Sequence, residues 1–593
     1  MPEPIDDHVD LASLPKEERL ARMRHSAAHV LAEAMLELMP EAKLGIGPPI
    51  DTGFYYDFEL PRPLTDDDLA RLTKRMTKSI QRRLPFQMAK ITRQEAEERW
   101  RDQPFKLDLL KDLPDDAITQ CTHGQFTDLC RGGHVNHTGE IPPFKLMNIA
   151  AAYWRGDEKN PQLVRVYGAL FENEDELEEY LRRREEAERR DHRRLGRELE
   201  LFTSHELIGQ GLPILLPKGA IIRSELERFI VDRERAYGYQ HIYSPVLGKV
   251  DLYKTSGHWD HYKDVMFPPM ELEHEEMVLR PMNCPHHILA YQAKLHSYRD
   301  LPVRIAELGA MFRYERSGVV GGLSRVRAMT LNDAHIFCRP DQVEDEIANV
   351  FRLVEEAFRA LGITEYRYRL SLRDPADTEK YVQDDEMWET GERVLRGALD
   401  RVGLDYYEAE GEAAFYGPKL DIQIFDSLGR EETIATIQVD LHLPRQFKLR
   451  YIGEDGAEHR PVIIHRGVIG TFERMLAYLI ELYEGNFPVW LAPVQAVLIP
   501  IADRHIPFAR EVYQKLHARG LRAEVDERSE RMNAKIRHHQ LQKVPYMLIV
   551  GDREVEEGAV AVRVRGGEDL GAIPVDSFVA RLSRERDDRD LTP

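Results

Sequence analysis

Three arginines in one segment of this 593-residue chain have types and spacing that suggest chemistry. Arg313 follows an apolar, strand-like stretch, and Arg325 and Arg327 come two positions apart after a glycine-containing turn. Side chains two apart on a strand point to one face, so we expect Arg325 and Arg327 to reach a site that Arg313 enters from the partner strand. Because planar guanidinium groups match phosphate oxygens, the hairpin predicts a triphosphate clamp. The alternative is a surface hairpin whose arginines are solvated.

Histidines and a cysteine form a second set with ligand-like spacing. His25 and His29 stand four residues apart, on one face of an expected amphipathic helix. Cys130 and His134 have the same separation. These residues could hold zinc, or they could line a cleft that hydrolyses a labile ester, a reaction that needs only a positioned water and oriented donors. We favour hydrolysis and leave a metal here open, and an isolated histidine pair could also line a helix face without function.

The arginine segment resembles motif 2 of the class II aminoacyl-tRNA synthetases, with Phe312 to Glu315 as its first strand. Its continuation from Asn332 to His335 is similar to the threonyl-tRNA synthetase family in particular. The glycines and helix start between His465 and Arg474 resemble motif 3. Lys218 to Leu247, a helix followed by a short strand with a proline, resembles motif 1, which builds the dimer interface in that family.

The resemblance implies an enzyme that activates L-threonine with ATP and transfers it to the 3′ end of tRNA(Thr). It implies Zn²⁺, one per subunit, and Mg²⁺ with ATP as cofactors, and a homodimer as the assembly. By resemblance, the catalytic residues are Arg313, Arg474 and His258; the ATP-binding residues are Arg313, Glu315, Arg325 and Arg474; the threonine-binding residues are Asp333, Tyr416 and Gln438; the zinc ligands are Cys284, His335 and His465; and the anticodon-binding residues are Ser529, Glu554 and Arg563.

The N-terminal motifs resemble the editing domain shared by threonyl- and alanyl-tRNA synthetases. This implies hydrolysis of mischarged seryl-tRNA(Thr). An open zinc and Asp333 would reject valine, which has no hydroxyl, but serine lacks only a methyl, a difference of about 1–3 kcal/mol. A second, hydrolytic site would supply the missing discrimination. The residues that the resemblance assigns to this site are His25, His29, Tyr56, Lys106, Asp128, Cys130 and His134.

Several positions depart from the family pattern. The departures are Gly133 in place of proline, His286 in place of glycine, Tyr314 in place of asparagine, Leu331 and Asn332 in place of Gln-Asp, Glu432 and Thr433 in place of Trp-Gln, and Ser529 in place of asparagine. None removes an expected zinc ligand or phosphate-binding arginine. The resemblance covers about residues 20–585, and we expect the form without the N-terminal ubiquitin-like module of many relatives.

The resemblance and the pattern of expected helices and strands together divide the chain into four parts, which position the site residues. We expect an α+β and α/β multidomain protein with an editing domain at 1–172, a linker helix at 173–202, a class II catalytic core with an antiparallel sheet at 203–488, and an α/β anticodon-binding domain at 489–593. The linker carries Glu/Arg pairs at helical spacing nearly throughout, which predicts one long solvated helix.

Composition excludes some classes and leaves others open. A hydrophobic content of 42% and a charged content of 31% are typical of a globular protein. No apolar run reaches the ~18 residues of a membrane span, and the acidic start has no signal-peptide character, so we expect a cytoplasmic protein without a membrane partner. Four cysteines are too few for a disulfide framework. The net charge of −21 argues against a general nucleic-acid coat protein but does not exclude tRNA binding.

Two alternatives stay open from the sequence. A catalytically silent paralogue could bind tRNA or a partner as a regulator. A synthetase for proline, serine or histidine shares the catalytic fold, although the Cys/His set and the editing motif count against it.

Overall fold

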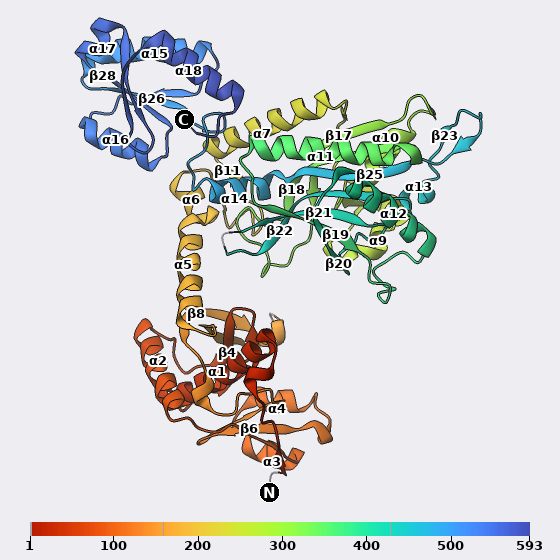
Figure 1. Ribbon diagram of the computed structural model, residues 1–593, viewed down its shortest axis with the longest axis vertical. Coiled ribbons are helices and arrows are strands. Elements are labelled where there is room, and N and C mark those ends of the chain that lie inside the picture. Colours follow the sequence, from red (N-terminus) through yellow and green to blue (C-terminus); the bar gives the residue numbers. More distant parts are fainter. Residues whose placement is uncertain (1–2, 158, 427, 593) are drawn as a thin grey trace. The chain divides into compact units, whose positions relative to one another are not determined.

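The computed structural model describes residues 3–157, 159–426 and 428–592. They form two compact units, Met1–Glu185 and Glu186–Pro593 (Figure 1). This division is coarser than the four parts expected from the sequence, whose boundaries stay a prediction. None of the described helices is both long enough and apolar enough to cross a membrane.

The first unit contains two sheets. One has the order β1-β5-β6-β7, and the other has the order β2-β4-β9-β8 with β3 paired to β4. The strands are β1 (Glu3–Ile5), β2 (Lys43–Leu44), β3 (Pro49–Ile50), β4 (Gly53–Glu59), β5 (Gln87–Lys90), β6 (Thr119–His123), β7 (Phe126–Leu129), β8 (Phe144–Tyr153) and β9 (Gln162–Leu170). The helices are α1 (Lys16–Leu38), α2 (Asp66–Gln81), α3 (Arg93–Arg99) and α4 (Pro104–Leu110).

Helix α1 is the central element of the first unit. It has neither glycine nor proline between Lys16 and Leu38, and its alanines and leucines are good helix formers. Its buried face includes Val30 and Leu31, which belong to the same hydrophobic core as Phe54 of β4. The helix also carries His25 and His29, so this packing fixes their position.

The second unit is built on an eight-stranded sheet with the order β12-β17-β18-β25-β22-β21-β19-β20. Its five central pairings, from β17 to β19, are antiparallel, as expected from the sequence. The strands of this sheet are β12 (Gln240–His241), β17 (Val303–Phe312), β18 (Ala328–Cys338), β19 (Tyr366–Leu372), β20 (Tyr406–Glu410), β21 (Lys419–Phe425), β22 (Glu431–Asp440) and β25 (Val462–Thr471). Its main helices are α7 (Pro217–Ala236), α10 (Cys284–Gln292), α11 (Val343–Ala360), α12 (Asp385–Val402) and α14 (Phe472–Leu482).

The two faces of the central strands differ in chemistry. Side chains alternate between the faces. Ala334 and Ile336 of β18 and Ile464 of β25 belong to the main hydrophobic core together with side chains of α7, α11 and α14, and Figure 1 shows α7 and α11 lying along the sheet. The intervening residues, His335 and His465, therefore point to the opposite face.

The prediction of a single linker helix is wrong. The structure has α5 (Glu174–Arg190) and α6 (His192–Glu198), separated at Asp191. Asp191 is not helical, and its carboxylate accepts a hydrogen bond from the backbone N–H of Arg193, so it caps a new helix. Pairs of charges at helical spacing do not reveal such a break.

The strand expected over residues 240–247 is also only partly present. β12 covers Gln240–His241 and pairs in parallel with β17, and the next strand, β13, begins at Leu247 and ends at Lys249. Pro245 lies between them and has no N–H for a sheet ladder.

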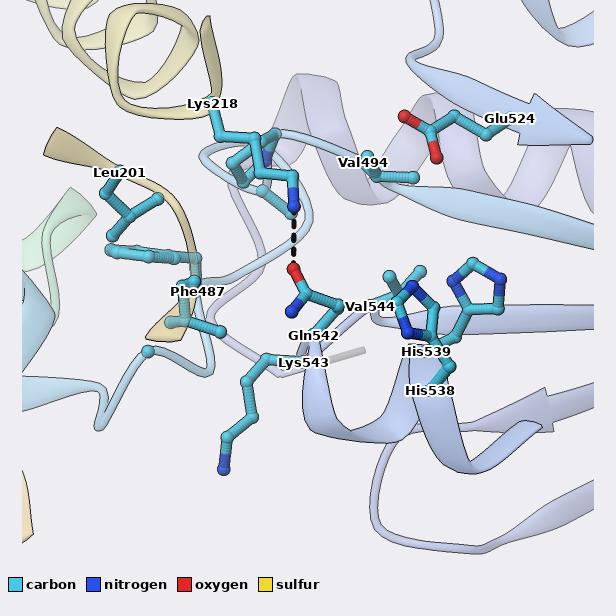
Figure 2. Close-up of a pocket in the computed structure, with 14 residues that line it drawn as sticks. Leu201, Lys218, Phe487, Val494, Glu524, His538, His539, Gln542, Lys543 and Val544 are labelled. Carbon is cyan, nitrogen blue, oxygen red and sulfur yellow. Dashed lines mark hydrogen bonds between the residues drawn. The ribbon is translucent and has the colours of Figure 1, made fainter. Parts of the chain in front are cut away.

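A smaller α/β domain completes the second unit. Its five strands have the order β27-β26-β28-β29-β30. The elements are β26 (Ala496–Pro500), α15 (Ile506–Ala518), β27 (Ala523–Val525), α16 (Met532–Leu541), β28 (Tyr546–Val550), α17 (Asp552–Glu557), β29 (Ala559–Val564), β30 (Asp569–Pro574) and α18 (Val575–Asp588). Lys218 of α7 donates to Gln542 with a separation of 2.6 Å, beside a small cavity that Figure 2 shows.

Candidate active sites

Cys284, His335 and His465 come together on the face of the eight-stranded sheet that α7 and α11 leave free. Their ligand atoms lie within 4.8 Å of one another, and all three side chains are buried. His335 and His465 are directly opposite each other on β18 and β25, with ring centroids 4.5 Å apart. Cys284 is the first residue of α10. The sequence separates these residues widely, and the sheet brings them together.

Hydrogen bonds define which ring nitrogen of each histidine is free. His465 Nε2 is 2.8 Å from a carboxylate oxygen of Asp440 and therefore donates to it. His465 Nδ1 has no hydrogen-bond partner in the described structure, although it is buried. The Nε2 atom of His335 is likewise buried and without such a partner. Two imidazole lone pairs and a thiol, a donor set that zinc prefers, therefore face one point, so these residues fit a zinc ion.

A cavity of about 200 Å³ lies next to this cluster. Cys284, Asp333 and His465 line it together with Arg313 and Arg474. The guanidinium of Arg474 donates to the backbone oxygens of Ser324 and Thr433, and burial lowers its pKa. Because an arginine stays charged even when its pKa is lowered, the cavity holds a fixed positive charge suited to phosphate.

The three-arginine clamp expected from the hairpin is only partly right. Strand β18 begins at Ala328, so Arg325 and Arg327 lie in the loop before it and do not share a strand face. Arg325 lines the cavity and forms an ion pair of 2.9 Å with Glu315. Arg327 instead donates to backbone oxygens of Glu315 and Gln210 and does not belong to the described cavity lining. Two arginines spaced two apart predict a regular strand, and the glycine-containing loop does not form one.

The residues expected to bind threonine also line the cavity. Asp333 accepts a hydrogen bond of 2.9 Å from Asn283, and Gln438 accepts one from the hydroxyl of Tyr416. The ring of Tyr416 stacks on His465 with centroids 4.9 Å apart. All three expected residues, Asp333, Tyr416 and Gln438, are therefore within one pocket.

His258 lies outside the group of described residues that line the cavity. It is fully buried, its Nδ1 lies 2.8 Å from the hydroxyl of Ser256, and burial lowers its pKa to about 3. It is absent from the described lining of the cavity. Its Nε2 has no hydrogen-bond partner in the described residues. Its expected role at the terminal ribose stays a prediction.

Two of the departures from the family pattern have a structural account. The amide of Asn332 donates to Glu234 of α7 at 2.7 Å, and its oxygen accepts from the backbone of Val468, so it anchors β18 on the side away from the cavity. Thr433 lines the cavity, and its backbone oxygen holds Arg474. Neither departure takes a ligand away from the site.

The residues expected at the hydrolytic site also converge. The ligand atoms of His25, His29, Cys130 and His134 lie within 4.8 Å of one another, so these residues could hold a metal ion. Cys130 Sγ is 3.1 Å from His134 Nε2 and 3.6 Å from His25 Nε2. A cavity of about 440 Å³ is lined by both His25 and His29.

The hydroxyl of Ser26 determines the tautomer of His134. It donates to the backbone oxygen of Arg22 at 2.8 Å, so it must accept from His134 Nδ1 at 3.2 Å. His134 Nε2 then carries a lone pair toward Cys130. Burial lowers the pKa of His25, His29 and His134 and raises that of Cys130 to about 12. Without a metal, the site therefore consists of neutral imidazoles, which can accept a proton, and a neutral thiol.

Tyr56, Lys106 and Asp128 form a buried network beside these histidines. Lys106 Nζ is 2.6 Å from Asp128 Oδ1 and 3.0 Å from the hydroxyl of Tyr56, which donates to the other oxygen of Asp128. Lys106 and Asp128 also line the cavity. The paired charges provide fixed, oriented donors and acceptors at its wall.

The residues expected at the anticodon are spread over three elements. Ser529 is exposed before α16, Glu554 is in the first turn of α17, and Arg563 is on β29. Glu554 accepts a hydrogen bond from the backbone N–H of Gly551, which caps its own helix. No hydrogen bond or ion pair among the described residues joins the three.

Sequence reasoning missed the residues that support the expected zinc ligands. Asp440 and His287 contact His465 and His335, and Glu307 holds His287. Only the position of His287 three residues after Cys284 offered a signal. Asp440 and Glu307 are brought to the site by strand pairing, which spacing along the chain does not show.

The sheet, the arginine-lined cavity and the cysteine and histidine cluster together have the architecture of a class II aminoacyl-tRNA synthetase. The family model "tRNA synthetase class II core domain (G, H, P, S and T)" matches residues 269–483. The model "Anticodon binding domain" matches residues 495–585, and "Threonyl and Alanyl tRNA synthetase second additional domain" matches residues 118–167.

Relatives narrow this class to one family. The threonine–tRNA ligase of Anoxybacillus flavithermus is 53% identical over 98% of this chain and 91% of its own length. Threonine–tRNA ligase 1 of Bacillus subtilis is 52% identical over the same shares. The chain therefore belongs to the threonine–tRNA ligase family and carries its editing-type second additional domain. Membership of a proline, serine or histidine family, an alternative from the sequence, is wrong.

Solved structures agree with this assignment. The RNA-binding domain of the threonyl-tRNA synthetase from Cryptosporidium parvum has a TM-score of 0.63 and 36% identity, covering 66% of this chain and 98% of that one. A putative threonyl-tRNA synthetase from Aeropyrum pernix has a TM-score of 0.58 and 29% identity, covering 68% of this chain and 98% of that one.

Proposed function

We propose that the chain joins L-threonine to tRNA(Thr) in two steps at the cavity of the second unit. ATP first activates threonine as the adenylate, and the threonyl group then passes to the 3′ end of the tRNA. The observation that carries this proposal is the meeting of the Cys284, His335 and His465 cluster with Arg313 and Arg474 around one cavity.

The residues of this cavity act by positioning and charge. Arg313 holds the α-phosphate as charge develops there, while Arg474 and Arg325 hold the γ-phosphate. Arg325 must leave its ion pair with Glu315 to do so, which frees Glu315 to meet the adenine. His258 acts near the terminal ribose in the transfer step. No covalent bond between the protein and the substrate is needed.

Cys284, His335 and His465 would hold the zinc ion. A zinc ion held there would act as a Lewis acid for the amino and hydroxyl groups of threonine. Asp333 accepts the hydrogen bond of the threonine hydroxyl, and Tyr416 and Gln438 complete the pocket. Valine offers no hydroxyl to donate to Asp333, and a missing hydroxyl of this kind is worth roughly 10⁴-fold. Mg²⁺ would accompany the phosphates of ATP.

Serine satisfies the same groups as threonine, so the first unit removes it by hydrolysis of seryl-tRNA(Thr). Neutral His134, with its lone pair at Nε2, and the buried pair of Lys106 and Asp128 orient water and the ester. Gly133 has a φ of +82°, a conformation that glycine adopts freely and that proline, with φ fixed at about −65°, cannot adopt.

The assembly and location form part of the same proposal. Tyr243, in the segment that resembles motif 1, is 97% exposed, and Val246 and Leu247 beside it are also exposed. An apolar surface of this kind supports a homodimer. The anticodon of tRNA(Thr) would meet Ser529, Glu554 and Arg563. All four cysteines are unpaired, in keeping with the cytoplasm.

The test is ATP–pyrophosphate exchange with threonine, serine and valine on the zinc-loaded protein. Exchange is expected with threonine, more weakly with serine, and negligibly with valine. No exchange with any of the three would favour the silent paralogue. Exchange with valine equal to that with threonine would contradict the role of Asp333 and the zinc ligands in selection.

A further inference from the structure

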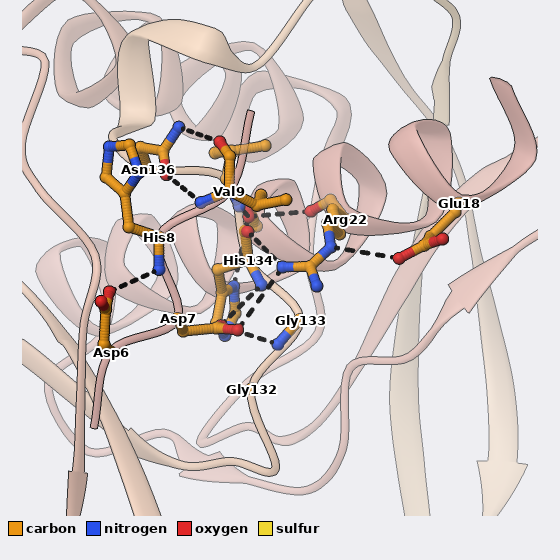
Figure 3. Close-up of polar contacts among 12 residues, drawn as sticks. Asp6, Asp7, His8, Val9, Glu18, Arg22, Gly132, Gly133, His134 and Asn136 are labelled. Carbon is orange, nitrogen blue, oxygen red and sulfur yellow. Dashed lines mark hydrogen bonds and ion pairs between the residues drawn. The ribbon is translucent and has the colours of Figure 1, made fainter. Parts of the chain in front are cut away.

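The N-terminal segment of the chain reaches the hydrolytic site through one carboxylate. Strand β1 pairs with β5, and the chain then passes the turn between Cys130 and His134. Asp7 Oδ2 accepts hydrogen bonds from the backbone N–H of Gly133 at 3.0 Å and of His134 at 3.4 Å (Figure 3). The family models and the sequence motifs assign nothing to this segment.

Arg22 of α1 holds the same turn together with Asp7. Its Nη1 lies 3.5 Å from Asp7 Oδ1 and donates to the backbone oxygen of His134 at 3.2 Å. His134 is thus bound through both its N–H and its C=O, by two groups of opposite charge that also contact each other. Arg22 is on the same helix as His25 and Ser26, so the turn is tied to the element that carries the facing residues.

The turn needs such support because of its backbone. Gly132 and Gly133 have φ values of +91° and +82°, in the region that glycine alone adopts freely. Two consecutive glycines lose much conformational freedom on ordering, and they have no side chains that could contact the surrounding residues. The N–H of Gly133 therefore depends on Asp7, and that of Gly132 points to the sulfur of Cys130 at 3.3 Å.

The position of Asp7 is itself fixed. The backbone N–H of Val9 donates to the side chain of Asn136 at 3.0 Å, and the amide of Asn136 donates back to Val9 at 2.9 Å (Figure 3). Asn136 follows His134 by two residues. The segment from Asp7 to Val9 is thus bound both to the backbone of Gly133 and His134 and to Asn136, so it holds the chain before and after His134.

We propose that Asp7 is a positioning residue of the hydrolytic site, which orders the turn of Gly132 and Gly133 and thereby sets the ring of His134 against Cys130. The proposal rests on the editing function proposed above. Among the described residues, Asp7 forms no hydrogen bond with Cys130 or with the ring of His134, and its hydrogen bonds to the turn are to backbone N–H groups. The Asp7 carboxylate, with Arg22 as its partner, replaces the rigidity that the two glycines do not provide.

The test compares Asp7→Asn with Asp6→Asn in the full chain. Asp6 is the exposed neighbour, and its carboxylate accepts only from the N–H of His8 among the hydrogen bonds found. Deacylation of seryl-tRNA(Thr) is measured in single turnover over a range of excess enzyme, and threonine charging is measured in parallel. Asp7→Asn should lower the rate constant at saturating enzyme by roughly tenfold or more, as expected for hydrogen bonds to a charged acceptor. Its half-saturating enzyme concentration and its threonine charging should not change, and Asp6→Asn should match the unaltered chain.

This readout separates positioning from stability. A smaller fraction of folded enzyme does not lower the single-turnover rate constant once folded enzyme saturates the tRNA. Arg22→Gln should slow deacylation similarly, and the double variant should be little slower than either, because both residues act on one turn. Equal rate constants for Asp7→Asn and the unaltered chain would overturn the role of Asp7 alone. No deacylation by the unaltered chain would overturn the editing function and this role with it.

Discussion

His287 Nδ1 lies 2.8 Å from His335 Nδ1, so one of these two nitrogens must donate to the other. His287 Nε2 is 3.1 Å from a carboxylate oxygen of Glu307 and donates to it. With its proton at Nε2, His287 accepts at Nδ1, and His335 is the donor. This chain of hydrogen bonds leaves the lone pair of His335 at Nε2, the atom that faces Cys284 and His465.

Replacing His287 should weaken zinc binding. In His287→Ala, His335 loses the acceptor that fixes its tautomer and ring orientation, and the loss of such a supporting contact typically costs about 10–100-fold in metal affinity. The measurement is competition for zinc against a chromophoric chelator. His286→Ala is the matched control on the same helix and should bind zinc like the unaltered chain. Equal affinities for the two variants would show that the contact between His287 and His335 has no influence on the metal.

Asp333→Asn should reduce threonine activation while barely changing the weak activation of valine. The carboxylate can only accept hydrogen bonds, and it already receives one from Asn283, whereas an amide there would place a donor near the threonine hydroxyl. A hydrogen bond to a charged group contributes about 1.5–3 kcal/mol, so kcat/KM for threonine should fall roughly 10–100-fold. Amino-acid-dependent ATP–pyrophosphate exchange measures both substrates. A parallel fall for valine would mean that Asp333 supports the cavity as a whole.

Much of the site could be anticipated because its motifs are local. Each of these motifs lies within one short stretch of the chain, and the structure keeps its residues close together. The motifs are the hairpin, the Cys-x-x-x-His pair and the helix that follows His465. The three expected zinc ligands could be joined only by family resemblance, since His335 and His465 meet through strand pairing between β18 and β25.

The errors arose where tertiary contacts override a local pattern. The loop containing Arg327 does not continue β18, because the N–H of Arg327 donates to Gly211 and its side chain to Glu315 and Gln210. The linker helix breaks at Asp191, beside the buried His192. The side chain of His192 is hydrogen-bonded to Glu481 on α14, which is far away in the sequence. No periodicity in the linker could reveal that contact.

His192→Ala should weaken ATP binding although His192 is in the linker. Its Nδ1 is 2.7 Å from Glu481, and its Nε2 accepts from the backbone of Leu323 at 3.2 Å, in the loop that carries Arg325. Without the His192 acceptor, this loop is less firmly held. One neutral hydrogen bond contributes about 1 kcal/mol, so KM for ATP should rise several-fold. The change in KM for threonine should be smaller. Exchange kinetics at varied ATP measure this. His205→Ala, in an exposed loop, is the control. A rise in both KM values alike would point to a general loosening of the core.

The stability supplied by Glu307 should depend on pH. Burial acts to raise the pKa of Glu307, but hydrogen bonds from His287 and Ser244 and the charge of Arg280 bring it down to about 2, from an ordinary value of 4.5. A carboxyl with a lowered pKa stabilises the folded state fully above about pH 5, and this contribution is lost as the pH falls through 4.5 toward 2. The melting temperature of Glu307→Gln should thus lie further below that of the unaltered chain at pH 7 than at pH 3.5. Scanning calorimetry of both proteins, with chelator present throughout, tests this, and a gap that widens toward low pH would contradict it.

Replacing His25 and His29 together by alanine should separate the two activities of the chain. Both side chains line the cavity of the first unit and neither belongs to the second unit, so threonine charging should remain within about twofold of normal. Deacylation of seryl-tRNA(Thr) should fall by at least roughly 10²-fold, the usual contribution of a positioned proton-transfer group. Seryl-tRNA(Thr) should then accumulate when serine is supplied with ATP. His8→Ala, an exposed histidine of the same unit, provides the control. If the double variant still cleared seryl-tRNA at the normal rate, the histidine cluster would not be the hydrolytic site, and the polar network of Tyr56, Lys106 and Asp128 would be the next group to replace.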